Sequence, residues 1–154
     1  MKIKTTKRVV SAGEFFAVNG NNTTILKDDE IVTEIQVPLL NVHTKSKFIK
    51  FAIRKSIDFP IVNCAAAIES EHGIVKKARI CLNSVYGKPY RVDSTEQYLN
   101  GKMIDEPTAE RAADTIVENT CPLADNKYKI QIARTLVKRV ILACSSSDPV
   151  EKNR

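Results

Sequence analysis

The hydrophobic pattern of the sequence changes its period just after Pro89, and this change constrains the fold more than any other feature. Before it, short segments rich in β-branched residues follow one another with turn residues between them, which predicts strands. These segments are Glu30–Pro38, Lys47–Lys55, Pro60–Ser70 and Ile74–Val85, with a turn at His72-Gly73. Their spacing favours an antiparallel sheet.

After Pro89 the apolar residues recur at helical spacing. Asp93 followed by Glu96 predicts a capping box, and Gly101 predicts the end of that first helix. A second helix is expected from Pro107, with one face formed by Ala109, Ala112, Ala113, Ile116 and Val117. A third is expected after Asp125, with an apolar stripe formed by Ile130, Ala133, Val137, Val140, Ile141 and Cys144.

Strands followed by helices predict an α+β fold, in which an antiparallel sheet of three to four strands packs against three helices. The chain has 154 residues, of which 43% are hydrophobic and 27% charged, so it can build a core without metal or disulfides. The four cysteines form no C-x-x-C pair, and we interpret them as free thiols and expect no metal site. No segment is long and apolar enough to cross a membrane, and a cytoplasmic location is expected.

The formal net charge of +6 raises the question of nucleic-acid binding. The basic residues are scattered along the chain, and aromatic residues make up only 6%, so platforms for base stacking are scarce. The charge pattern is more typical of a solvated surface, or of a surface that docks an acidic partner.

Motifs for phosphate cradles and nucleophile elbows are absent from the sequence, which has only five glycines. We therefore nominate no catalytic residue, and we expect the isolated chain to be inactive. The best candidates for binding are Lys50 and Arg54, which share one face of a strand, with Asp58 placed to pair with Arg54. They are either solvent-facing cations with a weak salt bridge or a contact for an anion or a ring system at a domain edge.

Four segments in order carry a resemblance to a known family: "DDEIVTEIQVP", "FIKFAIRKSIDFPIVNCAAAIE", "ARICLNSVYGKPYRV" with E-x-Y-L-N-G-K after it, and "LVKRVI". This order resembles the C-terminal domain of the flavoprotein subunit of molybdenum hydroxylases, the family of xanthine dehydrogenase and carbon monoxide dehydrogenase. The resemblance runs from about Arg8 to Ile141. It departs from the family at Ile132-Ala133, where relatives often carry Tyr-Arg.

The resemblance implies an accessory domain that closes one side of an FAD site in an electron-transfer oxidoreductase. FAD would be shared with N-terminal lobes that this chain lacks, and molybdopterin and 2Fe–2S clusters would belong only to partner subunits. The partners implied are the FAD-binding lobe or chain, an iron–sulfur subunit and a molybdopterin subunit, and a homodimer is a further option. Residues 1–20 would be a linker from the missing lobe, 21–146 the domain and 147–154 a disordered tail.

Two residues match the family's FAD contacts from this domain, Val32 and Lys50, and Arg54 with Asp58 matches its structural pair near the site. The resemblance also implies that FAD binds the isolated chain weakly or not at all. Two other functions stay open. A module that kept the fold for interaction or dimerisation would dimerise without a flavoprotein partner, and a basic nucleic-acid-binding protein would bind nucleic acid with a steep salt dependence.

Overall fold

The computed structural model describes residues 1–20, 22–54 and 57–145, so the expected tail at 147–154 lies outside the described residues. The chain divides into two compact units. The smaller unit comprises Met1–Asn41 and Tyr86–Pro89, and the larger comprises Val42–Val85 and Tyr90–Arg154. Among the described residues, no helix is long and apolar enough to span a bilayer.

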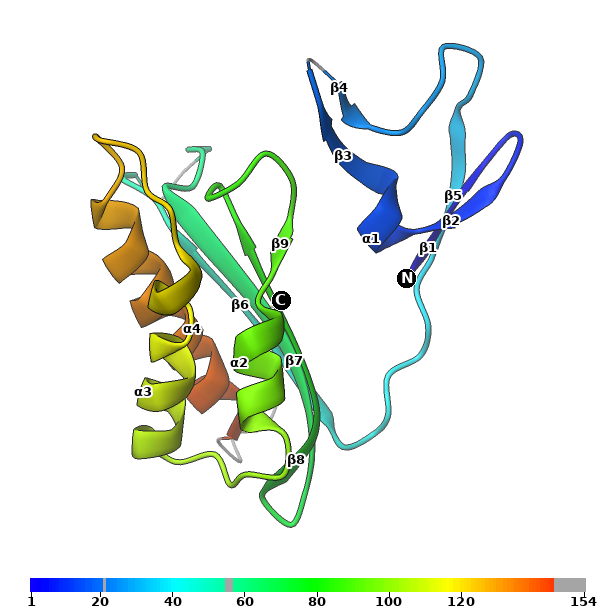
Figure 1. Cartoon of the computed structure of the whole chain (residues 1–154). Helices are drawn as coiled ribbons and strands as arrows, with labels where there is room; N and C mark the ends of the chain where they lie inside the picture. Colours follow the sequence, from blue (N-terminus) through cyan, green and yellow to red (C-terminus); the bar gives the residue numbers. More distant parts are fainter. Residues whose placement is uncertain (21, 55–56, 146–154) are drawn as a thin grey trace. The chain divides into compact units, whose positions relative to one another are not determined.

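The larger unit contains a four-stranded antiparallel sheet in the order β6-β7-β8-β9 (Figure 1). Its strands are β6 (Thr44–Phe51), β7 (Val62–Glu71), β8 (Ile74–Asn83) and the short β9 (Tyr90–Arg91). The turn predicted at His72-Gly73 joins β7 to β8, and both residues adopt positive φ, which glycine tolerates without steric cost. The expected antiparallel sheet is therefore confirmed.

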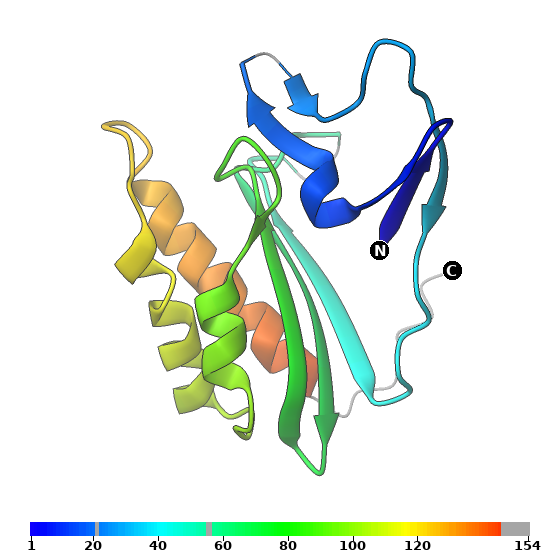
Figure 2. The same ribbon diagram turned by 45° about the vertical axis from the view of Figure 1, so that its right-hand side comes forward.

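Three helices cover one face of this sheet (Figures 1 and 2). They are α2 (Asp93–Leu99), α3 (Glu106–Asp114) and α4 (Tyr128–Ser145), with a 3-10 turn at Val117–Asn119. Helices α2 and α4 pack on the strands, and α3 packs on both of these helices. This sheet–helix layer holds most of the core, which includes Ile68, Ile80, Leu82, Leu99 and Ile141. Each such buried Ile or Leu side chain contributes about 1.5–3 kcal/mol to stability.

The two faces of the sheet differ in character, as β7 makes clear. Val62, Cys64, Ala66 and Ile68 are buried against the helices, whereas the alternate residues Asn63, Ala65, Ala67 and Glu69 are half-buried or exposed. Successive side chains of a strand point to opposite faces, so the second set lies on the face away from the helices. We call this second face the open face.

The smaller unit holds a three-stranded antiparallel sheet in the order β2-β1-β5 and a β3–β4 hairpin. Its elements are β1 (Lys2–Thr5), β2 (Val9–Ser11), α1 (Ala12–Phe15), β3 (Phe16–Asn19), β4 (Asn22–Thr24) and β5 (Val32–Gln36). Ile3 and Phe15 are its buried apolar side chains. Residues 1–20, expected as a linker, thus contain two strands, a short helix and a third strand, and the larger unit begins at Val42.

The strand predicted at Glu30–Pro38 exists as β5, but it pairs with β1 and not with the strands of the larger sheet. Ile35 lies opposite Ile3, and both are apolar. Alternation within one strand predicts the strand but does not identify its partner, which depends on residues far away in the sequence.

The predicted capping box of α2 is wrong. The N-cap is Val92, and no side chain caps the helix. Glu96 instead accepts a hydrogen bond of 2.8 Å from the backbone N–H of Ile80, because a buried backbone donor of β8 needs an acceptor. In α3 the expected start is confirmed, since Pro107 lies in the first turn and the Asp105 carboxylate accepts from the N–H of Thr108.

Candidate functional site

Lys50 lies near the end of β6, directly opposite Asn63 on β7, and Asn63 lies opposite Asn83 on β8. Directly opposed residues of antiparallel strands project from the same face. Because Asn63 stands between Val62 and Cys64, which are buried under the helices, all three polar side chains belong to the open face. We call Lys50, Asn63 and Asn83 the polar row.

The polar row offers one cation and two amides to a ligand. The Lys50 ammonium is exposed and carries three N–H donors, and each amide carries donors and an acceptor. The Oδ1 of Asn83 accepts a hydrogen bond of 2.9 Å from the N–H of Ser84, which orients that amide. The row is therefore suited to an anion or to the hydrogen-bonding edge of a heteroaromatic ring.

An apolar row lies beside the polar row on the same face. Phe48 lies opposite Ala65, which lies opposite Cys81, two residues along each strand from the polar row. Phe48 is 58% exposed although it is a large apolar residue of a strand. The polar and apolar rows together provide hydrogen-bonding groups next to a surface that favours contact with a ring.

Arg54 and Asp58, which follow β6 in the sequence, form an ion pair. The Asp58 carboxylate accepts from the backbone N–H of Arg54 at 3.2 Å and from its Nε at 3.3 Å. These bonds to Arg54 lower the pKa of Asp58, and the charge of Lys50 lowers it further. Both partners are accessible to water, so the pair orders the strand end near Lys50 more than it stabilises the fold.

Val32, the second candidate FAD contact, lies on β5 of the smaller unit and pairs with Thr5. Lys50 lies on β6 of the larger unit, so the structure assigns the two candidates to different sheets. Glu34, which follows on β5, forms an ion pair with Lys4 at 3.5 Å.

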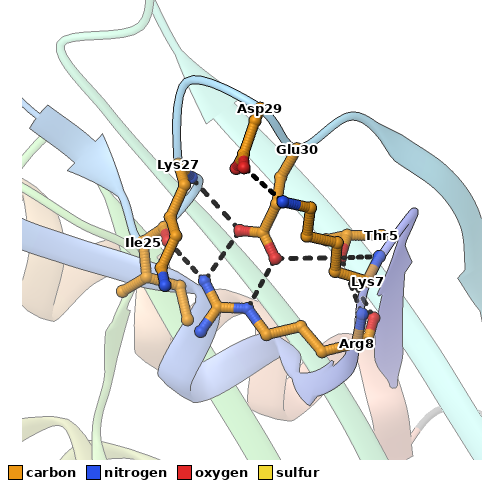
Figure 3. Close-up of polar contacts among 7 residues, drawn as sticks. All are labelled: Thr5, Lys7, Arg8, Ile25, Lys27, Asp29 and Glu30. Carbon is orange, nitrogen blue, oxygen red and sulfur yellow. Dashed lines mark hydrogen bonds and ion pairs between the residues drawn. The ribbon is translucent and has the colours of Figure 1, made fainter.

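The best-connected polar group of the smaller unit is Glu30, whose side chain is 1% exposed (Figure 3). Its carboxylate accepts hydrogen bonds from Arg8 Nε and Nη2, both at 2.9 Å, from the Lys27 N–H at 3.1 Å and from Thr5 Oγ1 at 3.3 Å. Arg8 also donates to the carbonyl oxygen of Ile25 at 2.7 Å. The hydrogen bond from Arg8 is the main cause of the lowered pKa of Glu30.

This network joins the β1–β2 turn to the segment just before β5, and Lys7 adds an ion pair with Asp29 (Figure 3). It thereby fixes where β5 begins, and Val32 is the first residue of that strand. Sequence reasoning missed Glu30 and Arg8, and it also missed Asn63 and Asn83. Their partners are set by strand register and long-range hydrogen bonds, for which the local sequence carries no signal.

Comparison with known proteins places these features in a family. The sequence profile of the CO dehydrogenase flavoprotein C-terminal domain matches residues 47–144, which include all of the polar row. The carbon monoxide dehydrogenase medium chain of Hydrogenophaga pseudoflava is 29% identical over 141 residues, covering 89% of this chain and 48% of that protein. A putative xanthine dehydrogenase FAD-binding subunit of Escherichia coli K12 is 24% identical over 136 residues, covering 82% of this chain and 47% of that protein.

Among solved structures, quinoline 2-oxidoreductase from Pseudomonas putida 86 superposes with a TM-score of 0.81 at 28% sequence identity. The match covers 94% of this chain and 52% of that one. The chain thus spans about half the length of the relatives that it matches. Because the profile covers most of the sequence and the sheet–helix fold agrees, the chain belongs to the CO dehydrogenase flavoprotein C-terminal domain family.

Proposed function

We propose that this chain acts as the C-terminal domain of an FAD-binding subunit in a molybdenum hydroxylase, where it closes one side of the FAD site. The observation that carries the proposal is the polar row on the open face, inside the segment that matches the family. One relative is itself named as an FAD-binding subunit. A second support is the exposed apolar row beside it.

FAD, when bound, supplies the electron-carrying chemistry. In this proposal Lys50 donates a hydrogen bond and places a fixed positive charge beside the ring system or its phosphates, which favours the more electron-rich state. Asn63 and Asn83 would offer hydrogen bonds to the same ligand, and the exposed Phe48 beside them would exclude water from it. Two inter-strand spacings separate the ends of the row, about 10 Å, comparable to the long axis of a fused three-ring heterocycle.

Val32 is proposed as a second FAD contact on the strength of the family resemblance alone. In that role Glu30 and Arg8 act as positioning residues, because their hydrogen bonds hold the start of β5. Arg54 and Asp58 likewise act on the site through the end of β6. In this proposal the site residues of the larger unit are Lys50, Asn63 and Asn83.

The other components of the proposed complex lie outside this chain, which spans about half the length of its relatives. An FAD-binding lobe would hold most of the cofactor, and separate subunits would hold molybdopterin and iron–sulfur clusters. We propose that the assembly is cytoplasmic. We also propose that the isolated chain binds FAD with a dissociation constant above about 100 µM, which means a binding free energy no more favourable than about −5 to −6 kcal/mol.

The first experiment is isothermal titration of the purified chain with FAD. Weak or undetectable binding is expected, and binding at about 1 µM or tighter would contradict the division of the site between two polypeptide segments. The second is co-expression of the chain with a protein carrying the flavin lobes of this family. The amount of flavin that copurifies is then measured by its absorbance.

The Lys50→Met variant tests the polar row in the same assay. It should lower the retained flavin roughly tenfold at limiting FAD, since one charged hydrogen bond is lost. Lys127→Met, which removes an exposed lysine just before α4, is the matched control and should retain flavin as the unchanged chain does. Equal retention of flavin by both variants would show that Lys50 does not contribute to the FAD site.

A further inference from the structure

A concave surface of the larger unit lies at the sheet edge where α2 meets β8, and its Arg91 lies opposite Cys81 of the apolar row. It has a volume of about 360 Å³, and its charged lining residues are Lys76, Lys77, Arg79, Arg91, Asp93 and Glu96. None of these residues is among the proposed FAD contacts, although Arg79, Arg91 and Glu96 lie in segments that carry the family resemblance. We call it the basic pocket.

Strand β9 pairs with Cys81 and Leu82, α2 packs beside β8, and the first residue of β8, Ile74, forms a bridge with Met103. The pocket lies along β8 between these pairings. The pairing of β7 with β8 also shifts register, because Glu69 lies opposite Lys77 and Ser70 opposite Val75. Lys76 is the extra residue of this bulge, and bulges re-aim side chains at sheet edges. Consecutive lysines thereby line one cavity.

A nearly buried carboxylate organises the floor of the basic pocket. Glu96 accepts hydrogen bonds from Arg91 Nε and Arg79 Nη1, both at 3.2 Å, in addition to its bond from the Ile80 N–H. Its side chain is only 7% exposed, whereas those of Arg79 and Arg91 are about half exposed. One anchored carboxylate thus holds two guanidinium groups in place and leaves donors of both accessible to a ligand.

The charges of the pocket do not balance. Four cationic side chains line the pocket with two carboxylates, Asp93 and Glu96, and Asp93 is already paired with Arg91 at 3.2 Å. A third carboxylate, that of Glu69 on β7, lies opposite Lys77, which leaves a smaller surplus of positive charge. Within the described part of the chain, neither Lys76 nor Lys77 forms an ion pair that would neutralise it. The surplus charge and the fixed guanidinium groups are the features that recognise phosphate oxygens.

We propose that the basic pocket binds a phosphate-bearing small anion. The guanidinium groups of Arg79 and Arg91 provide directed hydrogen bonds, and Lys76 and Lys77 provide charge at the rim. A cavity of about 360 Å³ fits a ligand of small-molecule size and favours this over an extended acidic peptide. The inference does not rest on the proposed FAD contacts.

The test is a titration of the full chain with inorganic pyrophosphate at low ionic strength. Binding is measured by isothermal titration calorimetry and by the changes in amide chemical shifts. Saturable binding is expected, with shifts confined to β8, β9 and α2. The double variant Lys76→Gln/Lys77→Gln should weaken it about tenfold or more, since two rim charges are removed.

The matched control, Lys127→Gln/Arg139→Gln, removes the same charge from exposed positions near and on α4 and should change affinity less than about twofold. Far-UV circular dichroism checks that both double variants are folded. Absence of saturable binding, or equal weakening in the two double variants, would overturn the proposal. Tighter binding of hexaglutamate through the same lysines would also overturn it, in favour of an acidic protein segment.

Discussion

The carboxylate of Glu30 accepts hydrogen bonds from two separate segments of the smaller unit, so its protonation should loosen that unit. Its pKa in the folded state lies below the ordinary value of about 4.3. The stabilisation is therefore fully present above that ordinary value and is lost as the pH falls through the folded-state pKa. Acid should open the smaller unit as Glu30 binds its proton.

Glu30→Gln is expected to reproduce this loss at neutral pH. Amide hydrogen exchange of β5 at pH 7, corrected for intrinsic rates, should be roughly tenfold faster than in the unchanged chain, because the ionic bond from Arg8 is lost. The variant should also show less further loosening between pH 5 and pH 3. Glu34→Gln, on the exposed surface of β5, is the control and should exchange normally; similar rates in both variants would argue against the anchoring role.

The cysteine side chains should differ sharply in reactivity. Burial raises the pKa of Cys64 to about 12 and that of Cys144 to about 11, whereas Cys121 is exposed. At pH 8 roughly one in a thousand Cys144 thiols, and fewer of Cys64, would be ionised. Iodoacetamide labelling read by peptide mass spectrometry should modify Cys121 first and the two buried thiols only after denaturation. Rapid native labelling of Cys64 would contradict its place in the core.

Among the elements, α4 is the one that the sequence specifies most completely. Five of the six predicted stripe residues, Ala133, Val137, Val140, Ile141 and Cys144, are buried, and the sixth, Ile130, is half-buried. Helical periodicity reports burial directly when one face packs against a sheet. The α2 capping box failed for the opposite reason, since the role of Glu96 is set by Ile80 and Arg91, which lie outside the helix.

Truncation of Ile141 tests the packing of α4. The side chain is fully buried, so Ile141→Ala should destabilise the chain by about 2–5 kcal/mol through lost burial and the cavity that remains. Urea unfolding followed by circular dichroism would measure the loss, with Arg139→Ala as an exposed control on the same helix. A loss below about 1 kcal/mol would mean that α4 does not pack as described.

At the scale of the whole molecule, the principal hydrophobic core lies entirely within the larger unit. Its buried residues run from Val62 to Cys144, and none of the residues that the structure describes within 1–41 belongs to it. A fragment comprising residues 42–154 should therefore fold alone and show one cooperative thermal transition. Calorimetry and circular dichroism would check this. A fragment without a cooperative transition would mean that the smaller unit is required for the fold of the larger.

The order of strands and helices predicted the α+β class and the sheet–helix layer, because both follow from local periodicity. The division at Asn41, the pairing of β5 with β1 and the polar row did not follow from it. Each of these depends on which distant segments pair. Lys50 was nominated from its spacing to Arg54 along a predicted strand and matched to an FAD contact by the family resemblance, whereas Asn63 and Asn83 became visible only through the strand register.

That register has a consequence for how the polar row tolerates change. If β7 slipped by one residue against its neighbours, Val62 or Cys64 would stand opposite Lys50, and the apolar side of the strand would turn to water. Such slippage would cost the burial of an entire strand face. The spacing of the three polar groups is thus constrained as strongly as the core itself. Substitutions elsewhere that leave the chain folded should leave this spacing unchanged.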